Sequence, residues 1–128
     1  MFRILLVDDE SHFRFAAKMV LKKAGFRVID CVNGEHALKA LLEEKDSFDL
    51  LVMDIIMPKM SGIGLLDELI KSQIEIPVLA VSGIADREMV QELKRRGCEN
   101  ILYKPFEPHQ LLRRVYDILG IETELMHA

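Results

Sequence analysis

The chain has 128 residues, half of them hydrophobic and 30% charged, a composition typical of a folded globular domain rather than a disordered chain. Its net charge of −4 disfavours nonspecific binding to nucleic acid, and its apolar runs are too short to cross a membrane. No signal-peptide pattern is present, and two cysteines, Cys31 and Cys98, do not suggest a disulfide framework. We therefore predict one cytoplasmic domain over residues 1–128, with reduced thiols and no output domain.

The first half of the chain alternates between strand-like and helix-like segments. Residues 3–7 (RILLV) form an apolar run that predicts a buried strand. Apolar residues at spacings of three and four run from Phe13 to Ala24 and predict a helix that ends before Gly25. The rest of this half is predicted to be a strand, a helix and a strand, at residues 27–31, 37–42 and 49–53.

The second half continues this alternation. Ser61 is predicted to cap a helix whose apolar face runs from Leu65 to Ile70. Another helix is predicted to begin after Asp86 and to end at Gly97. The remaining predicted elements are strands at 77–81 and 100–103 and a last helix between Pro108 and Gly120.

Five strands that alternate with five helices predict an α/β fold, a doubly wound parallel sheet with helices on both faces. The first, third and fourth strands are nearly continuous apolar runs, so we expect them in the centre of the sheet. The second strand alternates and the fifth is short and partly polar, so both are expected at the edges. The flavodoxin-like strand order 2-1-3-4-5 satisfies these requirements and places ligand binding at the carboxyl ends of the strands.

Polar residues follow four of these strands. Asp8 and Asp9 come after the first strand, Asp54 after the third, Ser82 after the fourth and Lys104 after the fifth. Carboxylates suit Mg²⁺ or Mn²⁺, and a lysine adds a further positive charge. An aspartate can also act as a nucleophile toward a phosphoryl group. The arrangement predicts a divalent-metal site at which an acyl phosphate forms on one of these aspartates.

Each of these residues also has an explanation without a function. Asp8 and Asp9 can be N-capping acids of the first helix, Asp54 a loop residue, Ser82 and Gly83 a turn, and Lys104 a solvated lysine before a proline. If the three carboxylates do converge, their repulsion is expected to raise at least one of their pKa values.

Four motifs, together with Gly62, resemble those of the receiver domain of bacterial two-component response regulators: VDDE (7–10), MDIIMP (53–58), VSG (81–83) and YKPF (103–106). The resemblance covers essentially the whole chain. It implies that Asp54 is the phosphoacceptor of a sensor histidine kinase or a histidine phosphotransfer protein. It also implies that Ser82 donates a hydrogen bond to one phosphoryl oxygen and that Lys104, which precedes a cis Pro105, pairs with another.

The same resemblance implies a magnesium site. Asp9 would bind the ion directly, Asp8 mainly through water, and Asp54 and the Ile56 backbone carbonyl would complete the protein ligands. Mn²⁺ would be an alternative ion at the same oxygen-rich site.

Two features depart from the family pattern. Receivers usually carry Tyr or Phe three residues before the lysine, and the inward rotation of this ring reports phosphorylation, whereas this chain has Ile101. Tyr103 lies on the same face of the strand, so either Tyr103 or repacking around Ile101 carries the switch; in a simpler alternative, Tyr103 only packs near the fourth helix. Ile56 and Ile84 occupy positions that gate water in the family, and their apolar side chains predict slow self-hydrolysis.

The resemblance implies a signalling domain rather than a turnover enzyme. Its output would be an unknown downstream protein, or a homodimer, bound through the fourth helix, fifth strand and fifth helix, with no direct nucleic-acid or membrane partner. The chain can also be a receiver cut from a longer regulator. Two further alternatives stay open. One is a degenerate receiver that only binds partners; the other is a haloacid-dehalogenase-like phosphatase, whose nucleophile belongs to a first-strand DxDx[TV] motif where this chain has DDES.

Two groups of side chains are predicted to have structural roles only. The basic segments 94–96 and 113–114 are expected to be solvated, near the C-terminal ends of helices. The seven methionines are expected to fill gaps in the packing.

Overall fold

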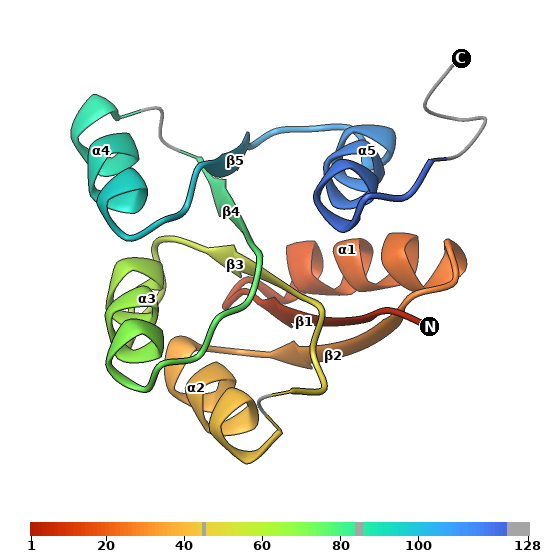
Figure 1. Cartoon of the computed structure of the whole chain (residues 1–128). Coiled ribbons are helices and arrows are strands. Elements are labelled where there is room, and N and C mark those ends of the chain that lie inside the picture. Colours follow the sequence, from red (N-terminus) through yellow and green to blue (C-terminus); the bar gives the residue numbers. More distant parts are fainter. Residues whose placement is uncertain (45, 84–85, 123–128) are drawn as a thin grey trace.

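The computed structural model describes residues 1–44, 46–83 and 86–122, and in them five strands alternate with five helices (Figure 1). In chain order the elements are β1 (Arg3–Val7), α1 (Ser11–Lys23), β2 (Arg27–Cys31), α2 (Gly34–Glu43), β3 (Leu50–Asp54), α3 (Gly62–Lys71), β4 (Val78–Ser82), α4 (Arg87–Arg95), β5 (Asn100–Tyr103) and α5 (Pro108–Leu119).

The strands form one parallel sheet in the order β2-β1-β3-β4-β5, which confirms the predicted fold class and strand order. β3 and β4 each lie one residue later than predicted. Asp54 is still paired with Val81 in the sheet, and the next amide, that of Ile55, donates to the Val81 carbonyl at 3.1 Å. Asp54 and Ser82 are therefore the last residues of their strands, held by the backbone hydrogen bonds of the sheet rather than by a loop.

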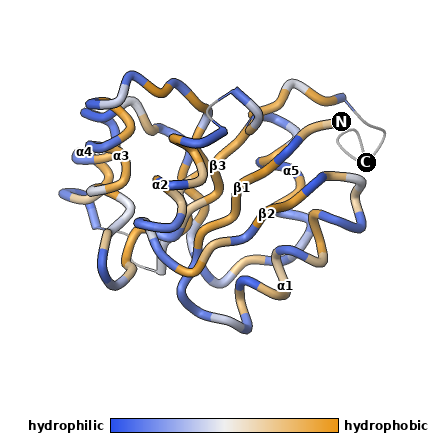
Figure 2. The backbone as a smooth tube through the Cα atoms, turned by 90° about the horizontal axis from the view of Figure 1, so that it is seen from below, coloured by the Kyte–Doolittle hydropathy of each residue, from blue (hydrophilic) through white to orange (hydrophobic). Residues whose placement is uncertain are grey.

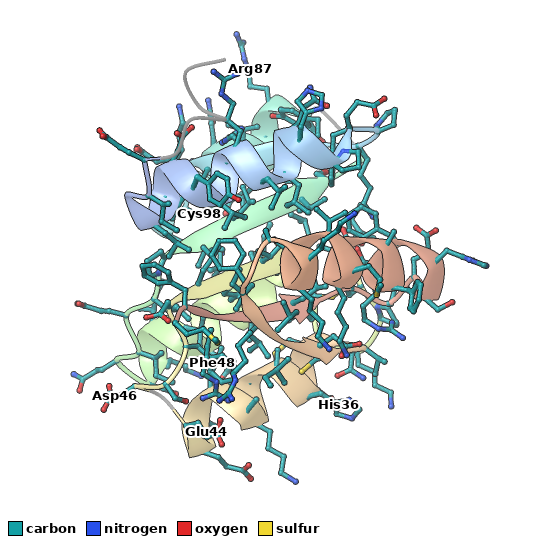
Figure 3. All side chains as sticks on the ribbon, turned by 90° about the vertical axis from the view of Figure 1, so that its right-hand side faces the viewer. His36, Glu44, Asp46, Phe48, Arg87 and Cys98 are labelled. Carbon is teal, nitrogen blue, oxygen red and sulfur yellow. The ribbon has the colours of Figure 1, made fainter. Side chains whose placement is uncertain are left out.

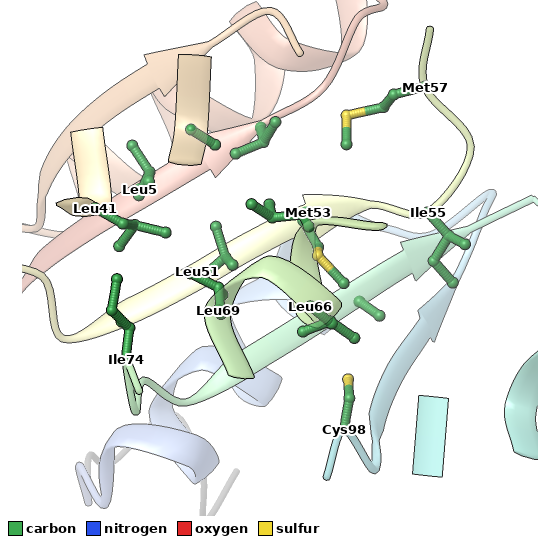
Figure 4. Packing of buried hydrophobic residues seen from close by; sticks show 14 of the residues in the cluster. Leu5, Leu41, Leu51, Met53, Ile55, Met57, Leu66, Leu69, Ile74 and Cys98 are labelled. Atoms are coloured by element: carbon green, nitrogen blue, oxygen red, sulfur yellow. The ribbon is translucent and has the colours of Figure 1, made fainter. Parts of the chain in front are cut away.

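Helices cover both faces of the sheet: α1 and α5 lie on one face, and α2, α3 and α4 on the other (Figure 1). Alternate strand residues enter the two cores, so that Leu5 and Leu51 pack beneath α2 and α3 whereas Leu6 and Val52 pack beneath α1 and α5. Figure 2 shows hydrophobic residues along β1 and β3, and Figure 4 shows the packing of the first of these cores. The central strands are thus buried on both faces, as their apolar sequences predict.

Several predicted helix ends are confirmed. The Ser61 hydroxyl accepts a hydrogen bond from the Gly64 amide at 3.1 Å and caps α3, and the Asp86 carboxylate caps α4 through the Glu88 amide at 2.9 Å. Gly120 follows α5 with φ +71°, in the left-handed region that favours glycine.

The prediction that segments 94–96 and 113–114 are merely solvated is wrong for one residue of each. Arg96 pairs with Asp67 of α3 at 2.7 Å and with Glu92 of α4 at 2.7 Å, so it ties the end of α4 to α3. The Arg114 guanidinium donates to the Ile101 carbonyl at 2.9 Å and ties α5 to β5. Other charged side chains, such as Arg87, do lie on the outside of the ribbon (Figure 3).

Candidate functional site

Three aspartates meet at the carboxyl ends of β1 and β3. Asp8 follows β1 and is fully buried, Asp54 ends β3 and is partly buried, and Asp9 is exposed. One carboxylate oxygen from each lies within 4.8 Å of those of the other two. Three oxygen donors of this kind in so small a space fit a hard divalent cation such as Mg²⁺. The predicted convergence of these carboxylates is therefore confirmed.

The Asp8 carboxylate is held in place by the local backbone. Its Oδ1 accepts a hydrogen bond from the Glu10 amide at 2.8 Å, and the Arg14 guanidinium donates to the Asp8 carbonyl at 2.8 Å. The N-cap residue of α1 is Glu10, without a side-chain capping hydrogen bond. Neither Asp8 nor Asp9 caps the helix, so that structural explanation does not account for them.

Lys104 reaches the aspartates from the loop between β5 and α5. Its Nζ lies 3.3 Å from Asp8 Oδ2 and 3.6 Å from Asp54 Oδ2. It also lies 4.0 Å from the centroid of the Phe13 ring, within range of a cation–π interaction. The Lys104–Pro105 bond is cis, as the resemblance implies. Lys104 is thus an ion-pair partner of the site rather than a solvated lysine.

Phe13 is a site residue that the sequence prediction missed. Its place in the apolar repeat of the first helix suggested core packing alone. In the structure it is partly buried and also contacts Phe106 edge-to-face, with the ring centroids 5.5 Å apart. The useful signal was present, because Phe106 belongs to the YKPF motif that carries the lysine.

The protonation of the site is set first by burial. Burial raises the pKa of Asp8 above its ordinary value of 3.8, and the Asp54 charge adds to the rise. Burial likewise raises the pKa of Asp54, with a contribution from Asp9, while Lys104 lowers the pKa of both groups. The predicted direction is confirmed, but repulsion between carboxylates is a smaller cause than desolvation.

The loop after Asp54 folds back onto the end of β3. Ile55 is buried, whereas Ile56 is 53% exposed, and its amide lies 3.3 Å from Asp54 Oδ1. The Gly62 amide donates to the Ile55 carbonyl at 2.8 Å. A Cβ at Gly62 would lie 2.9 Å from the Asp54 carbonyl oxygen, so the loop requires glycine there. Ile84, predicted to act with Ile56, lies outside the described residues.

Ser82 is the buried hydroxyl at the end of β4, 1% exposed, one residue beyond the partner of Asp54 in the sheet. Strand alternation turns Ser82 toward the face that α4 covers. Its Oγ donates a long hydrogen bond to the Sδ of Met89 on α4, at 3.9 Å. Met89 is a second site residue that the sequence prediction missed, because a methionine on a helix face predicts only that the side chain fills a gap in the packing.

The two candidate switch residues differ in their surroundings. Ile101 is partly buried against the core beneath α2, α3 and α4. Tyr103 is 40% exposed and lines a groove of about 380 Å³ with residues of α4, among them Arg87, Val90 and Lys94. This position matches the simpler alternative, in which Tyr103 packs near α4; which residue acts as the switch stays a prediction.

A comparison with known protein families agrees with the acidic site described above. The family model of the response regulator receiver domain matches residues 4–116. The chain belongs to the response regulator receiver domain family. This family consists of signalling domains that interact with kinases and phosphotransfer proteins and that bind Mg²⁺ through an acidic pocket. In the described part of this receiver, no helix is long and apolar enough to span a membrane.

Relatives of known sequence include both single receivers and longer regulators. This receiver is 33% identical over 119 residues to the chemotaxis protein CheY of Bacillus subtilis, covering 92% of this chain and 98% of that protein. It is 34% identical over 117 residues to the probable transcriptional regulator ycf27 of Cyanidium caldarium, covering 91% of this chain. It spans only 45% of the length of that regulator.

Solved structures share the same fold. A response regulator receiver domain protein from Clostridium thermocellum superposes with a TM-score of 0.85 at 26% identity, covering 94% of this chain and 95% of that one. The CheX–CheY–BeF3–Mg²⁺ complex from Borrelia burgdorferi gives a TM-score of 0.85 at 26% identity, covering 91% of this chain and 88% of that one.

Proposed function

We propose that Asp54 accepts a phosphoryl group from a phosphohistidine of a sensor histidine kinase or a histidine phosphotransfer protein. The observation that carries this assignment is that the Asp54 side chain is partly open to solvent while its negative charge is paired with Lys104. Its side chain is 12% exposed and lies 3.6 Å from Lys104. Asp8 is paired with Lys104 but is fully buried, and Asp9 is exposed but within the described chain forms no ion pair with Lys104.

In this reaction an Asp54 oxygen forms the new O–P bond while the N–P bond of the phosphohistidine breaks, and the departing imidazole takes up a proton. Phosphoryl transfer needs mainly positioning and charge neutralisation. Lys104 supplies one positive charge, and its ammonium group would pair with a phosphoryl oxygen. Ser82, held at the end of the neighbouring strand, would donate to another.

The same site is proposed to bind Mg²⁺ or Mn²⁺ through Asp8, Asp9, Asp54 and the Ile56 carbonyl. The bound cation would neutralise charge on the phosphoryl oxygens, beyond what Lys104 alone supplies. The solved CheX–CheY complex with BeF3 and Mg²⁺ supports this, since its CheY is related in structure.

Phosphorylation is proposed to alter the face formed by α4, β5 and α5, and so to change binding to a downstream protein or to a second copy of the chain. Tyr103 or Ile101 would take part in this change. We expect Tyr103→Ala or Ile101→Ala to reduce the NMR shifts that phosphorylation induces in α4. If both variants keep the full shifts, neither residue is the switch.

The proposal is tested by incubating the chain with Mg²⁺ and acetyl phosphate, followed by intact-mass spectrometry. We expect one phosphoryl group on the wild-type chain and none on the Asp54→Asn variant. Asp67→Asn is the matched control, because Asp67 on α3 pairs with Arg96, which makes no contact with the site aspartates, so this change should leave labelling intact.

Two results would contradict the proposal. A wild-type chain that stays unmodified and does not bind beryllofluoride with Mg²⁺ would favour a receiver that only binds partners. Sustained release of phosphate from a phosphomonoester would favour a phosphatase.

A further inference from the structure

The contact between Ser82 and Met89 joins the site to α4. The Ser82 hydroxyl is buried at the end of β4, and the Met89 thioether, 3.9 Å away, is partly buried in the first half of α4. A thioether sulfur is a weak hydrogen-bond acceptor. This contact therefore stabilises its present arrangement only modestly, and a stronger acceptor nearby would replace it.

The C-terminal end of α4 is held by core packing and by an ion pair. Leu93 is fully buried in the core, and Arg96, just past the helix, pairs with Asp67 of α3. These attachments lie one to two turns beyond Met89. A change at Met89 is therefore expected to move the first half of α4 while the C-terminal half stays in place.

We propose that Met89 is a positioning residue that holds the Ser82 hydroxyl toward α4 in the unphosphorylated protein and releases the first half of α4 on phosphorylation. This inference rests on the proposed phosphorylation of Asp54. A phosphoryl oxygen is charged and accepts a hydrogen bond far more strongly than a thioether does. A hydroxyl has one proton, so donation to the phosphoryl group ends donation to Met89.

The surroundings of Met89 suit this role. Met89 and Ile101 both pack against the core beneath α2, α3 and α4. Ser82 and Ile101 lie on the same face of the sheet by strand alternation. Methionine is unbranched and flexible, so it can follow the hydroxyl or refill the space beside Ile101 without a large cost. In a receiver that carries Ile101 on β5, Met89 gives α4 a direct contact with the phosphoryl-binding hydroxyl.

Two substitutions at Met89 with opposite expected effects test the proposal, with beryllofluoride and Mg²⁺ as the probe. Met89→Leu keeps the volume but removes the thioether acceptor on α4, so it should tighten beryllofluoride binding by about two- to fivefold, the worth of a weak hydrogen bond. Met89→Gln keeps the length but offers a stronger acceptor, so it should weaken binding by a similar factor. The chain has no tryptophan, so affinity is measured from ¹H–¹⁵N NMR titrations.

Matched controls separate this role from packing. Met19→Leu and Met19→Gln alter an exposed methionine of α1 and should leave the affinity unchanged. In a Ser82→Ala background, Met89→Leu and Met89→Gln should also lose their effects, because the donor is gone. Free Met89→Leu protein should show amide shifts at residues 87–90 displaced toward their beryllofluoride-bound values, with residues 93–96 unchanged.

The outcomes distinguish the two proposals. If the wild-type chain does not bind beryllofluoride with Mg²⁺, the proposed function fails. If the wild-type chain binds but both Met89 variants shift affinity in the same direction or not at all, the role of Met89 is overturned and the proposed function stands. The role of Met89 is also overturned if the effects of the two Met89 variants persist unchanged in the Ser82→Ala background.

Discussion

Lys104 Nζ lies 3.6 Å from Asp54 Oδ2 and 3.3 Å from Asp8 Oδ2, so one ammonium group pairs with two carboxylates at the ends of neighbouring strands. The Phe13 ring lies 4.0 Å from the same ammonium group. The positive charge is thus held where the partly exposed Asp54 and the buried Asp8 both benefit from it.

Replacing Lys104 by methionine is expected to raise the pKa values of Asp8 and Asp54, because Lys104 lowers both. It should also destabilise the protein by about 1–3 kcal/mol, since a buried carboxylate loses its charged partner. Carboxyl ¹³C NMR titration and urea unfolding measure the two effects. Lys18→Met is the control, because its partner Asp30 is partly exposed and the loss should stay below about 1 kcal/mol. Unchanged carboxyl titrations in the Lys104 variant would contradict the role of Lys104.

Asp54→Asn is expected to stabilise the protein against urea in the absence of divalent ions, by roughly 0.5–2 kcal/mol at neutral pH. The raised pKa of Asp54 means that its charged form is disfavoured in the folded state, chiefly by burial. The gain should shrink when Mg²⁺ is added, because the wild-type site then binds the ion and the variant has lost a carboxylate. Equal or lower stability of the variant in EDTA would defeat this prediction.

Asp30 is expected to respond to pH in the opposite sense. Its hydrogen bond with Lys18 lowers its pKa below 3.8, so its contribution to stability is present above that pH and is lost as the pH falls through the lowered value. Asp30→Asn should therefore cost up to about 1 kcal/mol at neutral pH, and this cost should disappear in acid. Urea unfolding at a series of pH values measures it, and a cost that grows in acid would be inconsistent with the ion pair.

Gly62→Ala is expected to destabilise the protein by about 1–3 kcal/mol, because its Cβ would meet backbone atoms of Asp54 and Ile55 at 2.9 Å. The same change should reduce phosphorylation, since the loop that follows Asp54 must shift. Gly64→Ala is the matched control: its Cβ would meet side-chain atoms only at 3.4 Å, and alanine favours a helix. The prediction fails if thermal unfolding shows equal stability for the two variants.

The sequence predicts the backbone fold of this protein better than it predicts the contacts between side chains. Strand order followed from which apolar runs were continuous, and the rim position of Asp54 followed from the strand that precedes it. That β3 and β4 end one residue later than predicted did not follow from the sequence, because an aspartate and a serine are poor strand formers and only pairing with a neighbouring strand keeps them extended.

The missed contacts share a physical cause. Phe13 and Met89 lie on helices and Arg96 directly follows one, and there periodicity tells which face is buried but not which side chain of another element each residue meets. Phe13 contacts Lys104 from a helix far away in the sequence, and Arg96 pairs with Asp67 across two helices. Such pairings depend on tertiary packing, which a single sequence does not reveal.

Ile56→Asn is expected to shorten the lifetime of phosphorylated Asp54. Ile56 lies two residues after Asp54 and is 53% exposed, and its apolar side chain offers no group that orients an attacking water. An asparagine there supplies a donor and an acceptor, and should speed hydrolysis on the order of tenfold, below the range of a fully positioned acid–base group. Decay of the phosphorylated chain is followed by intact-mass spectrometry after removal of acetyl phosphate. Ile70→Asn, an exposed isoleucine on α3, is the control and should not alter the decay. A longer lifetime in the Ile56 variant would show that the isoleucine does not protect the acyl phosphate.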